Sequence, residues 1–280
     1  MTTANLLPRE RATLVTSDAI HISAAHDPVA EGSTDTVALL GHGFTGSWKR
    51  PAVRAIAVAL ADQLGVVSFD FRGHGSSEGE SSLGDSEIYD VEAAAVWARS
   101  LGYRRVVSIG FSMGASVVLR HAALLGGVSA VAAVSGPAFW YYRGTPSMRF
   151  LHSVVESRIG RRAAALTRNT RISSRAWNPG ELPLSPVGAV AKLAAVDLLI
   201  VHGDVDRYFP LEHAHALFEA STHSPAWQSE NSGEKAGVRR DLWIESGFGH
   251  AESAIDRALV DRIGMWLSTP SQPVDDARAK

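Results

Sequence analysis

A serine flanked by two glycines stands between two apolar runs near the middle of the chain. In VVSIGFSMGASVVL, residues 106–119, Ser112 has Gly110 two residues before it and Gly114 two residues after it. A sharp turn from a strand into a helix crowds the residues beside its centre, so only very small side chains fit there. Such a turn holds a hydroxyl clear of the sheet, beside the free amides that begin the helix. The pattern predicts a nucleophile; the alternative is an ordinary glycine-rich turn.

A serine hydroxyl needs a general base that removes its proton, and two later segments supply the candidates. The base is usually a histidine, and a carboxylate holds its ring in the productive tautomer. Asp204 and Asp206 follow the apolar run LLIVHG, and His250 follows the run LWIESGFG. We therefore expect acyl transfer in which Ser112 attacks, His250 moves the proton and one aspartate orients the imidazole.

The other histidines are weaker candidates for chemistry. His74, in RGHGSS, precedes Ser112 and lies on a different loop, so we interpret it as structural. His213 and His215 are two residues apart on an expected helix and therefore point to different faces. No remaining histidine has a partner at metal-binding spacing, and the absence of cysteine excludes disulfides and thiolate ligands. We expect neither a metal nor a cofactor.

Alternating apolar runs and helix-like segments predict the framework that positions these residues. The runs are rich in Val, Ile, Leu and Ala and stop at Gly, Ser, Asp or Pro, which is typical of strands buried on both faces of a parallel sheet. The runs cover residues 36–43, 65–77, 105–112, 128–137, 196–204 and 239–250, and the helix-like segments cover residues 52–65, 87–102, 114–126 and 211–221. The predicted fold class is α/β, with a doubly wound, mostly parallel sheet. Weaker strands near 12–16 and 19–24 are expected to form an antiparallel edge.

The alternation stops after Pro137, where aromatic residues, arginines and prolines replace strand-like runs. We interpret this stretch as a helical cap inserted over one end of the sheet. From Pro137 to Gly180 there are eight arginines and one acidic residue, Glu156, so the local charge is +7. This charge favours either an anionic substrate or the commoner outcome, a solvated helix face. The expected units are a core of residues 1–136 and 191–270, a cap of residues 137–190 and a flexible tail of residues 271–280.

Five segments together resemble the α/β-hydrolase family, in its esterase, lipase and serine aminopeptidase-like group. They occur in the family's order as GHGFTGS (41–47), FDFRGHGSS (69–77), GFSMG (110–114), HGDVDRYFP (202–210) and GFGHAE (247–252). The resemblance implies a catalytic triad of Ser112, Asp206 and His250, because Asp206 is the aspartate that precedes the spaced proline. Asp204 is the alternative acid, and its other possible role is to cap the following turn.

The resemblance also implies two backbone amides that form an oxyanion hole. One belongs to Met113, the residue after the nucleophile. The other belongs to Phe44 in the HGF loop, where His42 is expected to brace the loop rather than to transfer protons. The form HGF, in place of HGGG, points to smaller esterases, and a polar surface loop at residues 221–238 explains the long interval between acid and base.

The function expected from these features is a serine hydrolase that cleaves carboxylic esters, as a carboxylesterase or a monoacylglycerol-lipase-like enzyme does. It would work through an acyl-enzyme. Alternatives on the same triad are a thioesterase, an amidase or peptidase, a perhydrolase and a carbon–carbon hydrolase. A non-enzymatic binding protein of the same fold is a further alternative, against which the intact triad argues. Phe139, Trp140, Tyr141 and Tyr142 could line an apolar acyl pocket or anchor the cap.

Composition bears on the possible partners of the chain. The net charge of −2 gives no global electrostatic attraction to nucleic acid or to an anionic membrane. The N-terminal residues do not resemble a signal peptide, and no run of about 20 apolar residues is present. We therefore expect a cytoplasmic protein that acts on a small-molecule acyl substrate, without a nucleic-acid partner and without stable membrane insertion.

Overall fold

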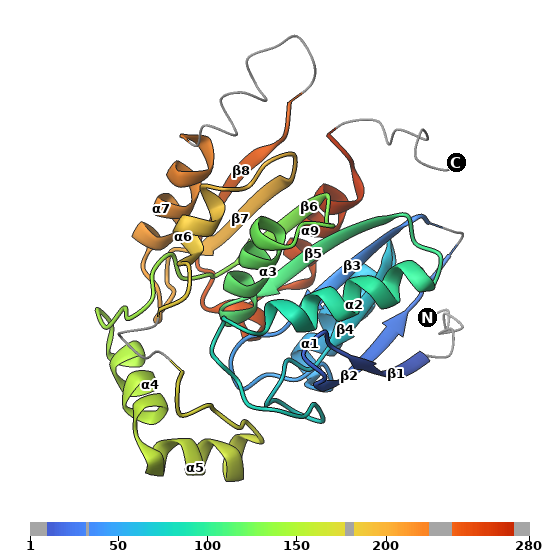
Figure 1. Cartoon of the computed structure of the whole chain (residues 1–280). Coiled ribbons are helices and arrows are strands. Elements are labelled where there is room, and N and C mark those ends of the chain that lie inside the picture. The colour runs from blue at the N-terminus through green and yellow to red at the C-terminus, as the bar shows by residue number, and fades with distance from the viewer. Residues whose placement is uncertain (1–9, 32–33, 177–181, 224–236, 272–280) are drawn as a thin grey trace.

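A single twisted sheet forms the centre of the molecule. The computed structural model describes residues 10–31, 34–176, 182–223 and 237–271. Within this part of the chain, eight strands pair in the order β1-β2-β4-β3-β5-β6-β7-β8 (Figure 1). They are β1 (Glu10–Val15), β2 (His21–Asp27), β3 (Thr36–Gly41), β4 (Gly65–Phe69), β5 (Arg105–Phe111), β6 (Ala130–Val134), β7 (Asp197–Gly203) and β8 (Arg240–Glu245). β1 and β2 form an antiparallel edge, and the strands from β4 to β8 are parallel. The expected α/β fold class is confirmed.

The central strands are buried on both faces because helices cover the sheet from both sides. Every residue of β3, β5, β6 and β7 is buried. Alternate side chains of one strand enter different layers: Leu39 packs in one apolar cluster and Leu40 in the other. This explains why these strands read as continuous apolar runs rather than as alternating patterns.

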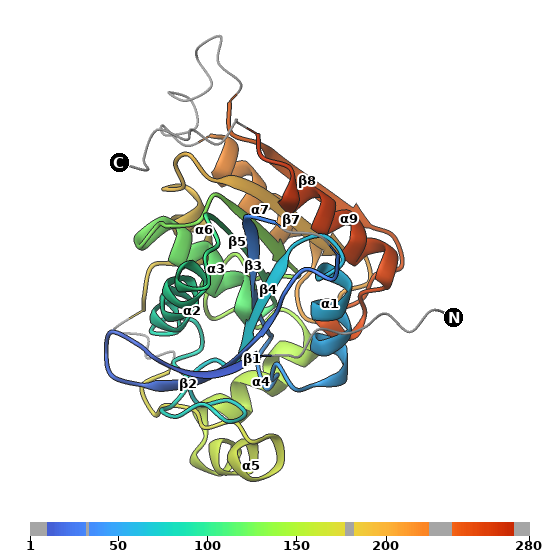
Figure 2. The same cartoon turned by 90° about the vertical axis from the view of Figure 1, so that its right-hand side faces the viewer.

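The helices divide between the two layers, as Figure 2 shows. One face carries α2 (Ile88–Ser100), α3 (Met113–Leu124), α6 (Pro186–Val190) and α7 (Leu211–Thr222), and the other carries α1 (Pro51–Leu60) and α9 (Arg257–Ser268). Helix α9 was not among the expected helices. Its buried residues Leu259, Val260, Ile263 and Leu267 nevertheless recur at helical spacing, so the signal was present in the sequence.

Two helices of the expected cap project away from the sheet (Figure 1). They are α4 (Pro146–Glu156) and α5 (Arg158–Arg168), and each begins at a proline or serine cap signal. The returning chain is bonded to the loop after β4: the N–H of Arg171 donates to Gly73 O at 2.7 Å, and that of Ser81 donates to Arg171 O at 2.8 Å. Helix α6, by contrast, packs against α3 and α7 of the core.

Some expectations about the chain stay predictions. The boundaries of core, cap and tail are interpretations of this arrangement, and residues 272–280 and most of the expected loop at 221–238 lie outside the described residues. In the part of the chain that is described, no helix has the length and apolar character needed to cross a bilayer.

Candidate active site

Ser112 lies at the turn from β5 into α3, at the centre of the sheet's carboxyl edge. Its backbone has φ 51° and ψ −114°, a left-handed and strained conformation for a non-glycine residue. A Cβ atom at Gly110 would lie 2.3 Å from the carbonyl oxygen of Gly114, and one at Gly114 would lie 2.6 Å from that of Gly41. Both glycines are therefore required by close backbone packing around the turn.

The position of this turn follows from the strand order. β3 lies between β4 and β5, so successive crossovers leave it in opposite directions. Gly41 at the end of β3 is in register with Gly110 near the end of β5. The HGF loop and the serine turn are consequently neighbours at the switch point of the sheet, where open α/β folds bind ligands.

A chain of two hydrogen bonds connects Ser112 to a buried carboxylate. Ser112 Oγ lies 2.9 Å from His250 Nε2, and His250 Nδ1 lies 2.7 Å from Asp206 Oδ2. The Asp206 side chain is fully buried and that of His250 is 17% exposed. With the Nδ1 proton directed at the carboxylate, the Nε2 lone pair faces the hydroxyl, which is the tautomer a general base needs.

Backbone amides hold the Asp206 carboxylate from its other side. Asp206 Oδ1 accepts the N–H of Tyr208 at 2.7 Å and that of Phe209 at 3.1 Å. Asp204, by contrast, is exposed and accepts the N–H of Gly247 at 2.7 Å, which joins the loops after β7 and β8. The structure thus brings Asp206, and not Asp204, to the imidazole.

The HGF loop is braced by a neutral histidine and by a carboxylate. The Nδ1–H of His42 donates to Gly43 O at 2.7 Å, and its Nε2 accepts the N–H of Phe71 at 3.1 Å. Glu252 Oε1 accepts the N–H of Gly43 at 2.9 Å. The backbone N–H of Phe44 donates to no acceptor within the described part of the chain, so this amide is available to a ligand.

The loop that carries His250 is positioned by contacts that the sequence motifs did not indicate. Tyr208 packs on the imidazole with ring centroids 4.3 Å apart, and Ser135 Oγ accepts the N–H of Ala251 at 3.1 Å. A Cβ at Gly203 would lie 1.9 Å from the carbonyl oxygen of Phe248, so only glycine lets this loop approach the end of β7. In the sequence, only the position of Ser135 after a strand end, in VSGP, indicated that it lies near the site.

The sequence comparison assigns the chain to a family. Residues 38–234 match the profile of the alpha/beta hydrolase family. The chain belongs to this family. The match covers more than two thirds of the chain and includes Ser112 and Asp206, and it confirms the resemblance found in the sequence motifs. No curated protein sequence matches the chain at a significant level.

Solved structures show the same fold at low sequence identity. The Pyrococcus furiosus esterase Pf2001 superimposes with a TM-score of 0.71 at 21% identity, covering 97% of this chain and 95% of that one. The esterase domain of a Rhodothermus marinus protein gives 0.63 at 20% identity, covering 95% and 100%. The Butyrivibrio proteoclasticus esterase Est1E with ferulic acid bound gives 0.60 at 17% identity, covering 91% and 99%.

An apolar pocket of this α/β-hydrolase opens between Ser112 and the cap helices. Its volume is about 50 Å³. The four aromatic residues expected near the site all line it, and its walls are Phe44, Leu83, Met113, Ser116, Pro137, Phe139, Trp140, Tyr141, Tyr142, Met148, Leu151, His152 and Phe209. Trp140 also joins two parts of the expected cap, because its Nε1–H donates to Pro183 O at 2.9 Å.

A second hollow, about 390 Å³, opens on the other side of the imidazole. It is lined by Val205, Arg207, Tyr208, Gly247, Gly249, His250 and Ser253. The exposed cation of Arg207 lies on the wall of this hollow, whereas the described wall of the apolar pocket beside Ser112 has no charged residue other than His152. The site therefore has an apolar side at Ser112 and a more polar side at His250.

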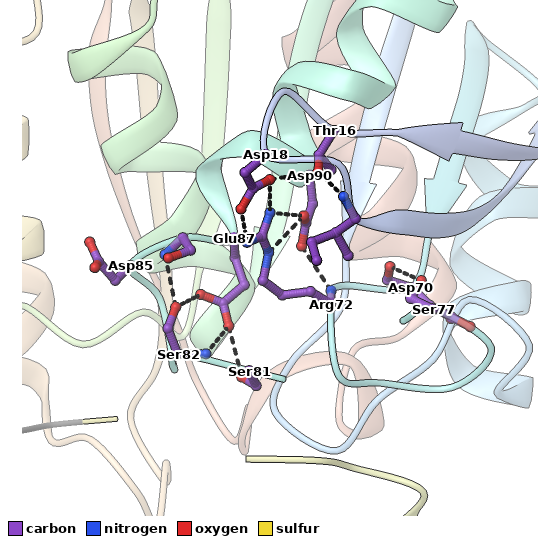
Figure 3. A network of polar contacts seen from close by, with 12 residues as sticks. Thr16, Asp18, Asp70, Arg72, Ser77, Ser81, Ser82, Asp85, Glu87 and Asp90 are labelled. Atoms are coloured by element: carbon purple, nitrogen blue, oxygen red, sulfur yellow. Dashed lines mark hydrogen bonds and ion pairs between the residues drawn. The ribbon is translucent and has the colours of Figure 1, made fainter. Parts of the chain in front are cut away.

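A network of charged and polar side chains surrounds the loop after β4 (Figure 3). Leu83, which follows this loop, lines the apolar pocket. The guanidinium of Arg72 lies between two carboxylates, with Nη1 2.6 Å from Asp18 Oδ2 and Nε 2.9 Å from Asp90 Oδ1. Hydrogen bonds from Arg72 lower the pKa of Asp18, so this carboxylate stays ionised. Nearby, the buried carboxylate of Glu87 accepts the N–H of Leu83 at 3.1 Å. The network thereby fixes the segment that places Leu83 in the pocket.

The other histidines near the site are buried and structural. The Nδ1–H of His74 donates to Arg72 O at 3.0 Å, and burial lowers the pKa of His74 to about 3. His202 Nε2 donates to Phe209 O at 2.8 Å, and burial also lowers its pKa. Both rings are therefore neutral near pH 7. Among the described residues no cluster of His, Cys, Asp or Glu is suited to hold a metal ion.

Proposed function

We propose that this α/β-hydrolase is a serine hydrolase that cleaves carboxylic esters through an acyl-enzyme. The observation that carries the proposal is the unbroken hydrogen-bond chain from Ser112 Oγ through His250 to Asp206. The three residues come from the carboxyl ends of β5, β7 and β8. The similarity in fold to proteins named as esterases supports ester hydrolysis as the reaction class.

In the proposed first step, Ser112 Oγ attacks the ester carbonyl while His250 Nε2 takes the hydroxyl proton. The oxyanion that forms is stabilised by the amides of Met113 and Phe44, each such donor typically contributing about 10²- to 10³-fold in rate. His250 then gives its proton to the leaving alcohol. The side chain of Asp206 holds the imidazole ring and stabilises its protonated form.

In the second step, water attacks the acyl carbon while His250 takes its proton. The bond from the acyl carbon to Ser112 Oγ then breaks, His250 returns the proton to Oγ and the carboxylic acid leaves. The acyl group fits the apolar pocket beside Ser112, and the leaving group fits the open hollow beside His250. With about 50 Å³ free, the pocket accepts a short acyl chain without rearrangement. Longer chains require the aromatic walls or the cap helices to move, so we propose short-chain esters as the preferred class.

A fluorophosphonate probe tests this function, because it reacts with a serine only when the serine is activated. We expect stoichiometric labelling that disappears in Ser112→Ala. p-Nitrophenyl esters of increasing chain length, acyl-CoA and peptide amides then separate the reaction classes. A preference for acyl-CoA would indicate a thioesterase instead of an esterase. A preference for peptide amides would indicate an amidase. A folded protein that takes no label would instead be a binding protein of this fold.

A further inference from the structure

Helix α5 lies farthest from the sheet and buries little of its own surface. In two views at right angles it forms one end of the molecule (Figures 1 and 2). Ala164 is its one buried residue. Both ends are nevertheless well capped: Ser157 Oγ accepts the N–H of Gly160 at 2.9 Å, and Asn169, in the left-handed conformation, closes the last turn. The helix is complete, yet the described part of the chain leaves its outer face uncovered.

Two large apolar side chains lie on that outer face. Ile159 is 83% exposed and Leu166 is 87% exposed. They are seven residues apart, or about two helical turns, so they lie on the same side with the exposed Ala163 between them. Single exposed aliphatic residues are ordinary, but an aligned pair on a projecting helix indicates a surface that is covered in some functional state.

Arginines border this apolar stripe. Helix α5 contains four arginines and no acidic residue. Arg161 donates to two backbone carbonyls of α4. Arg158, Arg162 and Arg168 are exposed, and no hydrogen bond or ion pair joins their side chains to the described part of the chain. By helical spacing Arg158 and Arg162 fall on one flank of the stripe, where their cations reach the same surface as the apolar pair.

The uneven distribution of charge along the chain orients the molecule toward an anionic surface. Residues 137–180 carry +7 and the whole chain carries −2, so the remainder carries −9. An anionic surface therefore attracts the cap end and repels the body of the molecule. The small net charge conceals this separation, and an electrostatic argument from the net charge alone misses it.

We propose that α5 docks the protein peripherally on an anionic lipid surface. The helix lies in the plane of the interface, with Ile159 and Leu166 at the boundary of headgroups and acyl chains and with Arg158 and Arg162 on lipid phosphates. Alternating aliphatic residues and arginines are the composition that such interfacial helices use. No spanning segment is needed, so the proposal agrees with the absence of one among the described helices.

Charge and shape favour lipid over other occupants. A symmetric contact between two copies through this face would bring Arg158 and Arg162 of both copies close together, which like-charge repulsion opposes. Protein interfaces need a shape-complementary partner around each anchor, whereas α5 is a convex end of the molecule that meets a flat, fluid surface without obstruction (Figure 2).

Co-sedimentation with vesicles tests the proposal on the full chain. Vesicles of phosphatidylcholine alone are compared with vesicles of equal parts phosphatidylcholine and phosphatidylglycerol, at low and high salt. We expect binding to the anionic vesicles that weakens as salt rises. Replacing both flanking arginines (Arg158→Gln, Arg162→Gln) should lower the partition coefficient about 25-fold, at about 5-fold for each charge. Ile159→Ser with Leu166→Ser should lower it by about 10-fold or more.

Matched variants separate docking from folding and from catalysis. Val96→Ser with Met265→Ser removes two exposed apolar residues of α2 and α9, on the body of the molecule, and should leave vesicle binding unchanged. Ser112→Ala should bind vesicles like the parent, so a failure of the proposed catalytic function does not affect this result. Hydrolysis of a water-soluble short-chain ester should be retained in all the α5 variants.

Four results would overturn the proposal. One is equal binding to neutral and anionic vesicles. Another is no binding to either. A third is a double apolar variant that binds like the parent. If α5 substitutions instead change the sedimentation coefficient of the protein without lipid, the helix is a contact between copies and lipid docking is wrong.

Discussion

Glu252 Oε1 accepts the backbone N–H of Gly43 at 2.9 Å, across 209 residues of sequence. A side chain two residues after the proposed base therefore holds the loop of the proposed oxyanion amide. This contact joins the loops after β3 and β8, so loop geometry and the position of His250 depend on each other. Because Glu252 accepts the Gly43 N–H, we assign the proposed oxyanion role in this loop to the adjacent amide of Phe44.

Glu252→Ala should lower kcat by about 10- to 100-fold with little change in KM. The physical reason is that a loosened loop weakens an interaction made mainly in the transition state. Glu252→Gln keeps an oxygen acceptor for the Gly43 N–H and should restore most of the rate. Steady-state kinetics on one p-nitrophenyl ester measure both constants. If Gln is as damaging as Ala, the charge of Glu252 matters rather than its hydrogen bond.

Asp206→Asn should reduce kcat by about 10⁴-fold without unfolding the protein. The amide cannot hold the imidazole in the tautomer that accepts the serine proton. Asp204→Asn is the matched control, since Asp204 Oδ1 only accepts the N–H of Gly247 and an amide oxygen replaces it. Activity and circular dichroism of the two variants provide the check. Loss of activity in Asp204→Asn alone would reverse the assignment of the acid.

Phe139→Ala should shift the preference of the enzyme toward longer acyl chains. Phe139 lines the pocket but is 47% exposed, so its truncation widens the pocket at little cost in stability. Each methylene newly accommodated should raise kcat/KM by about 4-fold, from roughly 0.8 kcal/mol of burial. Phe150→Ala, on the outer side of α4 at 71% exposure, is the control and should leave the chain-length profile unchanged. Identical profiles in both variants would exclude this pocket as the acyl site.

The buried neutral histidine His74 should make stability fall with acidification below pH 6.5. Burial, and next the neighbouring His42, lowers the pKa of His74 to about 3, whereas the unfolded value is about 6.5. Between these values the unfolded chain binds a proton that the folded chain does not. The contribution of neutral His74 to the free energy of unfolding should therefore be fully present above pH 6.5. Below pH 6.5 the free energy of unfolding should decrease by about 1.4 kcal/mol per pH unit.

Urea unfolding of His74→Asn measures this contribution. The asparagine amide keeps a donor for Arg72 O but does not titrate. The variant should be less stable at pH 7, and its stability should fall less steeply between pH 6.5 and 4 than that of the parent. If the pH profiles of the two proteins are parallel, folding does not lower the pKa of His74 and the prediction is wrong.

Much of the framework was predictable because its signals are local. Each apolar run contained one strand and began within two residues of its start, although the runs at 65–77 and 239–250 continued well past the ends of β4 and β8. The glycines beside Ser112 marked a backbone turn whose constraints span five residues. Helix α9 was missed although its apolar residues recur at helical spacing, whereas α5 buries only Ala164 and so carries little periodic signal. The order of the strands and the turn at Ser112 could therefore be predicted from short segments of the sequence.

The amino-acid sequence by itself determined the order of strands and helices, the strained turn at Ser112 and the two aspartates from which an acid could come. Only the tertiary structure decided that Asp206 contacts His250, that Glu252 holds Gly43, and that α5 presents its apolar stripe outward. These contacts join residues up to 209 positions apart. Strand order and register set such distances, and no local pattern encodes them, because each side chain's partner depends on where the whole sheet places the other loop.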